Sequence, residues 1–160
     1  MGQKDLQDFL RLVEQRGQLR RITAPVDGDL EAAAIADRVL VMGGPALLFE
    51  NVKGSSMPLV LNLLGTVERV AWSMGLERVE ELEELGSRLA LLQQPKPPKG
   101  LKELTSFSRV LWDLVKARPD RDLTPRCHQK VVSEEELDLN QLPLIRPWPG
   151  DAGRVITLGL

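Results

Sequence analysis

Residues 43–62 read GGPALLFENVKGSSMPLVLN, and the fold is built outward from this stretch. Its first part, Pro45 to Glu50, is a short apolar run without helical length, which is typical of a strand buried on both faces. Lys53 to Ser56 indicates a turn, and Pro58 to Asn62 indicates a second buried strand. Because the link between the two strands is short, we expect them to form a hairpin.

On the N-terminal side of the hairpin, the sequence predicts a helix, a strand and a second helix. Asp5 can cap the first helix, Gly17 can end it, and Leu19 to Ala24 indicates a short strand. The second helix is expected from about Asp29 to Met42, with Asp29 as its N-cap and the two following glycines as its stop. The first helix is indicated by apolar residues spaced i, i+3, i+4 and i+7, namely Leu6, Phe9, Leu10 and Val13.

Two more amphipathic helices are expected after the hairpin. Thr66 is the predicted cap of the first, which Gly75 interrupts. Its apolar side is expected to consist of Val67, Val70, Ala71 and Met74. The second has glutamates crowded at its start, where the helix dipole favours them. Its apolar stripe is expected to consist of Val79, Leu82, Leu85, Leu89 and Leu92.

The remainder of the chain changes character. The segment PKPPKG, Pro95 to Gly100, cannot continue a helix and indicates a stiff connector. One more helix is predicted over Phe107 to Val115, and Lys130 to Ser133 indicates a short strand before an acidic turn. Arg154 to Leu160 indicates a strand that is still running at the last residue, so we expect the chain to be part of a longer protein.

Together these elements indicate an α+β fold in two parts. An N-terminal mixed α/β domain is expected over residues 1–118, with the proline-rich connector 95–100 inside it. Residues 119–160 are expected to form a linker and the beginning of a β domain.

Composition and charge exclude several classes of protein. The chain has 160 residues, 42% hydrophobic and 28% charged, which is typical of a soluble globular domain. Its 21 basic and 23 acidic side chains give a net charge of -2, which argues against nucleic-acid binding, and the basic patch Arg16, Arg20 and Arg21 is diluted by nearby acidic residues. No stretch approaches the ~20 apolar residues that span a membrane, so contact with a membrane would be peripheral at most. With a single cysteine and no signal peptide, we expect a cytoplasmic protein.

The most reactive residue types do not assemble a catalytic group. Cys127 and His128 are neighbours, and neighbours in an extended segment point to opposite sides, so they cannot act as a nucleophile and its base. His128 alone remains open as a base, although no partner is near it in sequence. With no second His or Cys, a zinc site would need carboxylates, and no spacing indicates one.

Other polar clusters have ordinary structural explanations. Gly43-Gly44 follows a helix and precedes a strand, the reverse of a phosphate-binding turn, so a helix stop is favoured. Two alternatives stay open for Glu50, Asn51 and Lys53: they line a cleft, or they form the mouth of the hairpin, which needs polar residues in any case. A solvated helix start is favoured over a cation site for the glutamates Glu77, Glu80, Glu81, Glu83 and Glu84.

The aromatic residues are too few and too scattered to form a platform for stacking nucleobases. Trp72 and Trp112 lie on predicted helices, where we expect them to add core or interface mass. Trp148 lies in the proline-broken segment LPLIRPWPG (142–150) and is the better candidate for an exposed aromatic that makes contacts.

Four separated segments resemble the start of the UbiD-family decarboxylases, in order and with family-like spacing. They are DLQDFLRLVEQRGQLRRI (5–22), GGPALLFENVKGSSMPLVLNLLGTVERVAWSMG (43–75), QQPKPPKG (93–100) and DLNQLPLIRPWPGDAGRVITLGL (138–160). The branch that they resemble most is the 4-hydroxy-3-polyprenylbenzoate decarboxylase type of quinone biosynthesis.

The resemblance implies a fold and a chemistry. Family members have an N-terminal α+β domain, a split β-barrel that binds flavin, and a C-terminal domain that drives oligomerisation. Residues 119–160 would then hold the first strands of an incomplete split barrel. The implied reaction is reversible, non-oxidative removal of CO2 from an aromatic acid. It uses prenylated FMN, a manganese-type divalent ion and potassium, and the flavin comes from a partner enzyme.

The resemblance also implies which residues are missing here. The cofactor-binding Asn and Arg, the metal carboxylate and the catalytic Glu-Arg-Glu set would all lie beyond Leu160, so we expect no catalytic or metal-binding residue in this chain. Thr157 matches a barrel threonine that contacts flavin in relatives; a β-branched residue chosen to suit a strand is the equal alternative. The chain alone is therefore expected to bind no cofactor and to be inactive. A free-standing interaction module that reuses this domain is the alternative function.

Overall fold

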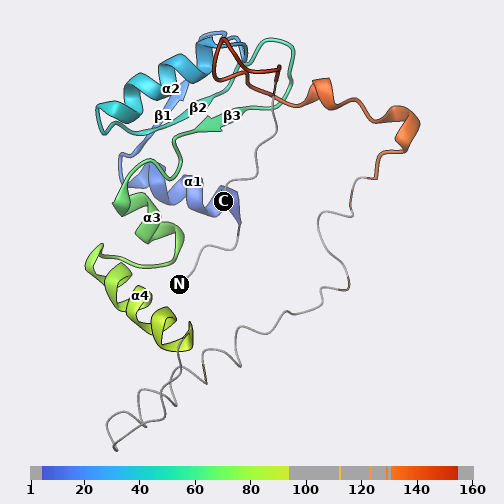
Figure 1. The fold of residues 1–160 in the computed structure, drawn as a ribbon. Coiled ribbons are helices and arrows are strands. Elements are labelled where there is room, and N and C mark those ends of the chain that lie inside the picture. Colours follow the sequence, from blue (N-terminus) through green and yellow to red (C-terminus); the bar gives the residue numbers. More distant parts are fainter. Residues whose placement is uncertain (1–4, 94–111, 113–122, 124–128, 130, 155–160) are drawn as a thin grey trace, which may run out of the picture. The chain divides into compact units, whose positions relative to one another are not determined.

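The computed structural model describes residues 5–93, 112, 123, 129 and 131–154 (Figure 1). The chain divides into two compact units. Residues 1–79 and 138–160 form the first unit, and residues 80–137 form the second. The predicted connector at 95–100, the helix at 107–115 and the strand at 154–160 lie almost entirely outside the described residues.

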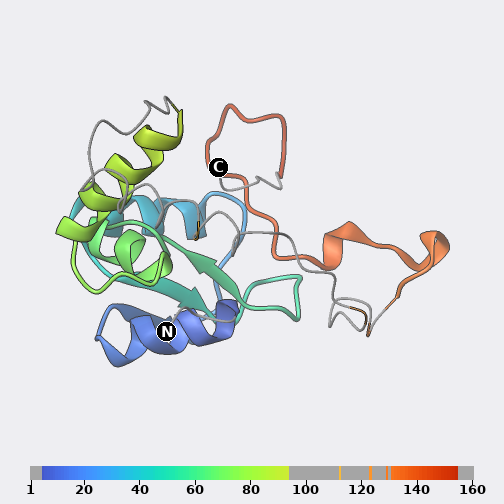
Figure 2. The ribbon, with the colours of Figure 1, turned by 90° about the horizontal axis from the view of Figure 1, so that it is seen from below.

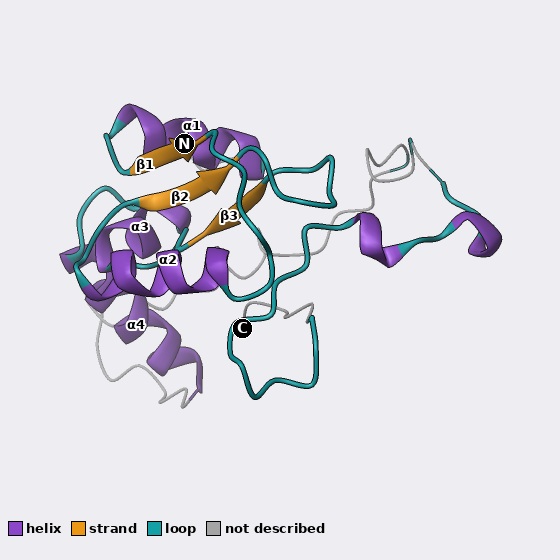
Figure 3. Ribbon diagram, turned by 90° about the horizontal axis from the view of Figure 1, so that it is seen from above, coloured by secondary structure: helices purple, strands orange, loops and turns teal. Residues whose placement is uncertain are grey.

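The first unit is organised around a mixed sheet of three described strands (Figure 3). The strands are β1 (Leu19–Ile22), β2 (Ala46–Phe49) and β3 (Leu59–Leu61), in the order β1-β2-β3. β1 pairs parallel with β2, and β2 pairs antiparallel with β3, which confirms the predicted hairpin.

The two strands of the hairpin differ in how deeply they are buried. All four residues of β2 are buried, as predicted for a central strand covered on both faces. The prediction that the second strand is buried as well was wrong, because Leu59, Val60 and Leu61 are only half-buried. Among the described strands, β3 pairs with β2 alone and lies at the edge of the sheet, so no described strand covers its outer side.

Two helices cover the opposite faces of this sheet (Figure 2). Side chains alternate across a strand, so β2 turns Leu47 and Phe49 to one face and Ala46 to the other. Leu47 and Phe49 pack in one core cluster with Ala32 and Ala36 of α2 (Glu31–Val41). Ala46 packs in a second cluster, with Phe9 and Val13 of α1 (Leu6–Gln15).

The predicted ends of α1 are confirmed. The Asp5 carboxylate accepts a hydrogen bond from the Asp8 amide at 2.9 Å, as a helix N-cap does. At the other end, the amides of Gly17 and Gln18 donate to the carbonyls of Glu14 and Val13. This pair of bonds is the Schellman motif, whose first residue after the cap requires a positive φ, and Gly17 has φ +69°.

The two ends of α2 differ in how well the sequence predicts them. Gly43, with φ +65°, ends the helix in a second Schellman motif, so the helix-stop interpretation is confirmed. The prediction that Asp29 is the N-cap was wrong. Leu30 occupies that position with φ +66° and no side-chain cap, because the Asp29 carboxylate binds Arg146 instead.

In α3 (Val67–Ser73), the cap is confirmed but the buried face differs from the prediction. Thr66 accepts from the Arg69 amide. Val67 and Met74, expected on the apolar side, are each 55% exposed, whereas Ala71 and the charged Arg69 are buried. The buried guanidinium displaces the predicted apolar stripe because it supplies hydrogen bonds to neighbouring turns, described below.

Helix α4 (Glu80–Gln93) lies in the second unit and confirms the predicted helix. Glu80, Glu81 and Glu83 lie in its first turn, as the dipole argument expects. In the expected stripe, Leu82 and Leu85 are half-buried and Leu89 is exposed.

The predicted strand at Lys130 to Ser133 is not formed by its described residues. Val131 to Ser133 lack regular structure, and Val131 is 84% exposed. No described strand pairs with this segment, and an unpaired extended segment has no ladder to stabilise it. Short 3-10 turns follow instead, at Glu134–Glu136 and Leu139–Gln141.

Candidate functional site

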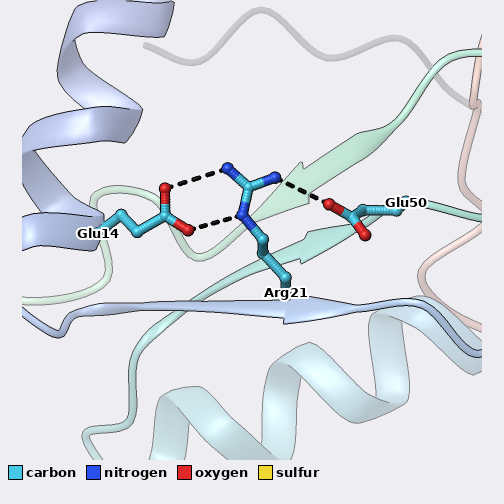
Figure 4. Close-up of polar contacts among 3 residues, drawn as sticks. All are labelled: Glu14, Arg21 and Glu50. Atoms are coloured by element: carbon cyan, nitrogen blue, oxygen red, sulfur yellow. Dashed lines mark hydrogen bonds and ion pairs between the residues drawn. The ribbon is translucent and has the colours of Figure 1, made fainter.

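A network of three charged side chains lies on the α1 side of the sheet (Figure 4). Arg21 of β1 donates from Nε and Nη2 to both carboxylate oxygens of Glu14, at 2.6 and 3.0 Å. Its remaining Nη1 donates to Glu50, the first residue after β2, at 2.8 Å. The alternation of β1 turns Arg21 toward α1, and the parallel pairing with β2 brings Glu50 alongside.

The chemistry of this network is that of a closed ion-pair cluster. The hydrogen bond from Arg21 lowers the pKa of the Glu14 carboxyl, and Glu14 and Glu50 together raise the pKa of Arg21. A carboxylate held ionised by a two-pronged guanidinium is a poor proton acceptor, so Glu14 is not prepared for acid–base work. The side chains are 35–49% exposed, so the network belongs to the surface.

The mouth of the hairpin is occupied by the domain's own contacts. Glu50 binds Arg21, and the Asn51 carbonyl accepts from the Val26 amide at 3.0 Å. The Lys53 Nζ lies 3.8 Å from the Asp27 carboxylate. These contacts favour the structural alternative over the cleft for the hairpin-mouth residues.

Arg69 is the buried polar residue that the sequence did not indicate. Its side chain is fully buried, and burial lowers the pKa of its guanidinium, which remains a cation. It donates to Gln18 Oε1 at 2.9 Å and to three backbone carbonyls at 3.2 Å, those of Gly44, Asn62 and Leu63. These acceptors belong to the turns after α1, α2 and β3, so Arg69 ties three connections together.

No pattern in a single sequence marks this role, because arginine is expected at the surface. Gly65 gives the nearest clue, since an added Cβ there would meet Arg69 Nη2 at 3.0 Å. No buried side-chain nitrogen or oxygen of the described residues lacks a hydrogen-bond partner. Each of the three guanidinium nitrogens of Arg69 donates to an acceptor in the same unit, so the side chain serves the architecture.

The C-terminal segment of the first unit is fastened to the start of α2. The Arg146 amide donates to the Gly28 carbonyl, and the Leu30 amide donates to the Arg146 carbonyl, both at 3.0 Å. The Arg146 side chain adds an ion pair, with Nε 2.6 Å from Asp29 Oδ1. We call these contacts between residues 28–30 and 144–146 the clasp.

The aromatic residues divide as the sequence predicted, with one exception. Trp72 packs with the α1 cluster, and the Arg16 guanidinium lies 4.3 Å above its ring. Trp148 is 61% exposed on a turn in which its amide donates to the Asp151 carboxylate. Trp112 is 63% exposed, so of its two predicted roles the core one is wrong.

The residues singled out for reactivity are placed as follows. Cys127, His128 and Thr157 all lie outside the described residues. Within the described part of the chain, no three His, Cys, Asp or Glu side chains gather in a way that fits a metal ion. Among the helices described, none is long and apolar enough to cross a membrane.

Two family models match the chain, in succession. The N-terminal domain of 3-octaprenyl-4-hydroxybenzoate carboxy-lyase matches residues 10–89. The Rift-related domain of the same carboxy-lyase matches residues 119–160. The chain belongs to the UbiD family. This confirms the resemblance drawn from the four sequence segments.

The chain is also similar to individual proteins. The Synechocystis protein sll0936 is 59% identical over 157 residues, which are 98% of this chain and 31% of that protein. The closed form of the vanillic acid decarboxylase of Sedimentibacter hydroxybenzoicus is 26% identical, with a TM-score of 0.66, over 94% of this chain and 29% of that one. An evolved dimeric form of the UbiD-class enzyme HmfF from Pelotomaculum thermopropionicum, in complex with prFMN, is 35% identical over 57% of this chain and 20% of that one, with a TM-score of 0.47.

The chain thus spans about a third of the length of two of these proteins, 31% for sll0936 and 29% for the vanillic acid decarboxylase. The mixed α/β fold of the described residues is similar to that of UbiD-class enzymes, as the resemblance implied.

Proposed function

We propose that this chain is the N-terminal part of a prenylated-FMN-dependent decarboxylase that removes CO2 from aromatic acids of the 4-hydroxy-3-polyprenylbenzoate type, in quinone biosynthesis. The observation that carries the proposal is the order of the two family matches, the carboxy-lyase N-terminal domain at 10–89 and the Rift-related domain at 119–160. Prenylated FMN would supply the electron sink for the carbanion-like electrons that CO2 leaves behind.

The domain division follows the same order. Residues 1–118 form the N-terminal domain, and residues 119–160 form a linker and the first strands of a split β-barrel that binds flavin. The start of the second match at residue 119 supports this division. The clasp would then be a contact between the two proposed domains, because it joins residues 144–146 to residues 28–30.

The 160-residue chain alone is proposed to be catalytically silent. Its prominent polar groups are committed: Arg21 is shared by Glu14 and Glu50, and Arg69 is surrounded by acceptors within its own domain. Prenylated FMN needs positioned charges, and the resemblance puts those groups beyond Leu160.

The test compares the 160-residue chain with the full-length protein, each reconstituted with prenylated FMN. Full-length protein should retain a flavin spectrum between about 340 and 450 nm through gel filtration and release CO2 from 4-hydroxybenzoate-type acids, faster when a 3-polyprenyl chain is present. The 160-residue chain should elute colourless and without turnover. Retained flavin in the short chain overturns its silence, and a full-length protein without flavin or turnover overturns the decarboxylase.

Thr157 is proposed to contact the flavin through its hydroxyl in the full-length protein. Thr157→Val keeps the β-branched shape and removes the hydroxyl, so it should weaken flavin retention, whereas Thr157→Ser should retain flavin more nearly like wild type. Thr23→Val, at an exposed position of the first domain, is the matched control. Equal retention by Thr157→Val and wild type would assign Thr157 to strand formation alone.

The remaining expectations also belong to the full-length protein. We propose a manganese-type ion and potassium beside the flavin, a homo-oligomer, a partner enzyme that supplies the prenylated flavin, and a cytoplasmic location. The described residues hold no gathered set of metal ligands, so the proposal assigns them no metal step. Metal analysis and light scattering of the full-length protein test the ions and the assembly.

A further inference from the structure

The first turn of α2 starts from a strained residue. Leu30 has φ +66° and ψ -40°, and the Glu31 amide donates to the Asp29 carbonyl at 2.8 Å. A hydrogen bond between residues two apart around such a φ is the rare γ-turn, a strained conformation for a residue that carries a side chain. Among the described residues, Asn62 is the other non-glycine residue with positive φ, and asparagine tolerates it far better than leucine.

The sequence offers α2 a better start. Asp29 is a preferred N-cap residue, and from that position its carboxylate would accept from the amides of Glu31 or Ala32. In the structure that carboxylate is bound by Arg146 Nε at 2.6 Å. The Ala32 amide donates instead to the Asp27 carbonyl at 3.0 Å.

Arg146 holds this arrangement in three ways at once. Its side chain donates to the Asp29 carboxylate, and its backbone amide donates to the Gly28 carbonyl. Its backbone carbonyl accepts from the Leu30 amide. The approach is so close that a Cβ built on Gly28 would lie 2.5 Å from the Leu144 carbonyl oxygen. The strain at Leu30 therefore coincides with the docking of a segment more than 110 residues away, since Asp29 and Arg146 are 117 residues apart.

We propose that residues 28–31 form a two-state switch that reports whether residues 144–146 are docked. In the docked state, Arg146 binds the Asp29 carboxylate, so Asp29 does not cap α2 and Leu30 is held in the γ-turn. In the released state, Asp29 caps α2, Leu30 takes a negative φ as the first helical residue, and the helix is one residue longer. This switch is independent of the proposed reaction, because it rests on the clasp alone.

The switch reaches the core because of where α2 packs. Ala32, whose amide changes its acceptor between the two states, is fully buried in the cluster with Leu47 and Phe49. Release of the segment therefore alters the first turn of a helix that lines the sheet. The segment matched by the Rift-related domain is thereby coupled to the N-terminal domain.

The test uses NMR of the whole 160-residue chain, with Gly28→Ala to expel the segment through the contact with Leu144. Gly150→Ala is the matched control, because nothing lies within 4 Å of its added Cβ. In wild type and the control, Leu30 should show the strong intraresidue amide–Hα NOE of a positive φ. In Gly28→Ala, the Arg146 amide should lose at least about tenfold of its exchange protection. Leu30 to Ala32 should take helical carbon shifts.

A second substitution identifies the cap. Asp29→Ala in the Gly28→Ala background should abolish the helical shifts at Leu30, because the released helix then lacks its capping carboxylate. If Leu30 keeps a positive φ after the Arg146 amide has lost its protection, the γ-turn does not depend on the docked segment. That result would overturn the switch. An Arg146 amide that stays protected in Gly28→Ala would overturn it too, since the close contact would then not hold the segment.

Discussion

The guanidinium Nη1 of Arg69 lies 2.9 Å from Oε1 of Gln18, which joins α3 to the turn between α1 and β1. Three carbonyls complete the shell of acceptors around this buried cation. Neutral oxygens thus compensate the charge. This arrangement requires that several turns adopt their native conformation at the same time.

Replacement of Arg69 by methionine should destabilise the protein by about 2–4 kcal/mol. The apolar side chain fills similar space but removes the Arg69 donors from Gln18 Oε1 and from the carbonyls of Gly44 and Leu63. Each buried group left unsatisfied costs about 1–3 kcal/mol before relaxation. Urea denaturation followed by circular dichroism measures the loss. Arg69→Lys keeps the charge but not the fork of donors, so its stability should lie between that of the wild type and that of Arg69→Met.

Arg20→Met is the matched control for this series, because Arg20 is exposed on the neighbouring β1. A surface replacement should change stability by less than about 0.5 kcal/mol. If Arg69→Met were no more costly than Arg20→Met, the turns would not depend on the buried guanidinium.

Acid should weaken the protein partly through Glu14. The hydrogen bond from Arg21 holds the pKa of Glu14 below its ordinary value in the folded state. The unfolded chain then binds the proton more tightly, so the contribution is present above the unfolded pKa of about 4.3 and is lost as the pH falls through the folded value. Glu14→Gln should therefore flatten the fall of Tm below about pH 4.3. Glu84→Gln on α4 should keep the wild-type profile, and an unchanged slope in Glu14→Gln would count against the pairing with Arg21.

Gly86→Ala should stabilise α4. Gly86 lies inside the helix, and nothing lies within 4 Å of an added Cβ. Alanine in a helix interior is favoured over glycine by about 1 kcal/mol, so amide exchange in α4 should slow about fivefold. Hydrogen exchange read by mass spectrometry on the α4 peptide checks this. Faster exchange would mean that another part of the chain occupies the space beside Gly86.

Thr66→Ala should weaken α3 by about 1 kcal/mol, because the Thr66 hydroxyl caps the Arg69 amide. Thr66→Ser keeps the hydroxyl and should restore most of the stability. Thr23→Ala, at an exposed position after β1, controls for the loss of a threonine elsewhere. Chemical denaturation ranks the variants; equal loss in Thr66→Ser and Thr66→Ala would assign the effect to packing rather than capping.

The elements that sequence reasoning predicted well are those fixed by local chemistry. The burial of β2, the Asp5 cap and the glycine stops at Gly17 and Gly43 each follow from a few adjacent residues. Predictions were wrong where a distant segment decides the outcome. Arg146, 117 residues away in sequence, binds the Asp29 carboxylate and so prevents Asp29 from capping α2. No local sequence pattern contains that contact.

Two other residues show the same limit at the candidate site. Arg69 is buried because carbonyls from separate turns converge on it, which its helical neighbours do not reveal. Val131 has the β-branched side chain of a strand residue but no described strand to pair with, so propensity alone did not produce a strand there. The family, by contrast, was recognisable from sequence because four ordered segments carried it.

The long separation between Asp29 and Arg146 has a consequence for how the polypeptide acquires its structure as it is synthesised. Contacts between β1, β2 and β3 join residues within about one quarter of the chain, so they can form while later residues are still on the ribosome. A contact that closes a loop of 117 residues must wait for Arg146 to emerge, and it carries a larger entropy cost of closure. During its first seconds the nascent domain should therefore lack the ion pair between Asp29 and Arg146. Formation of that pair should be among its last folding events.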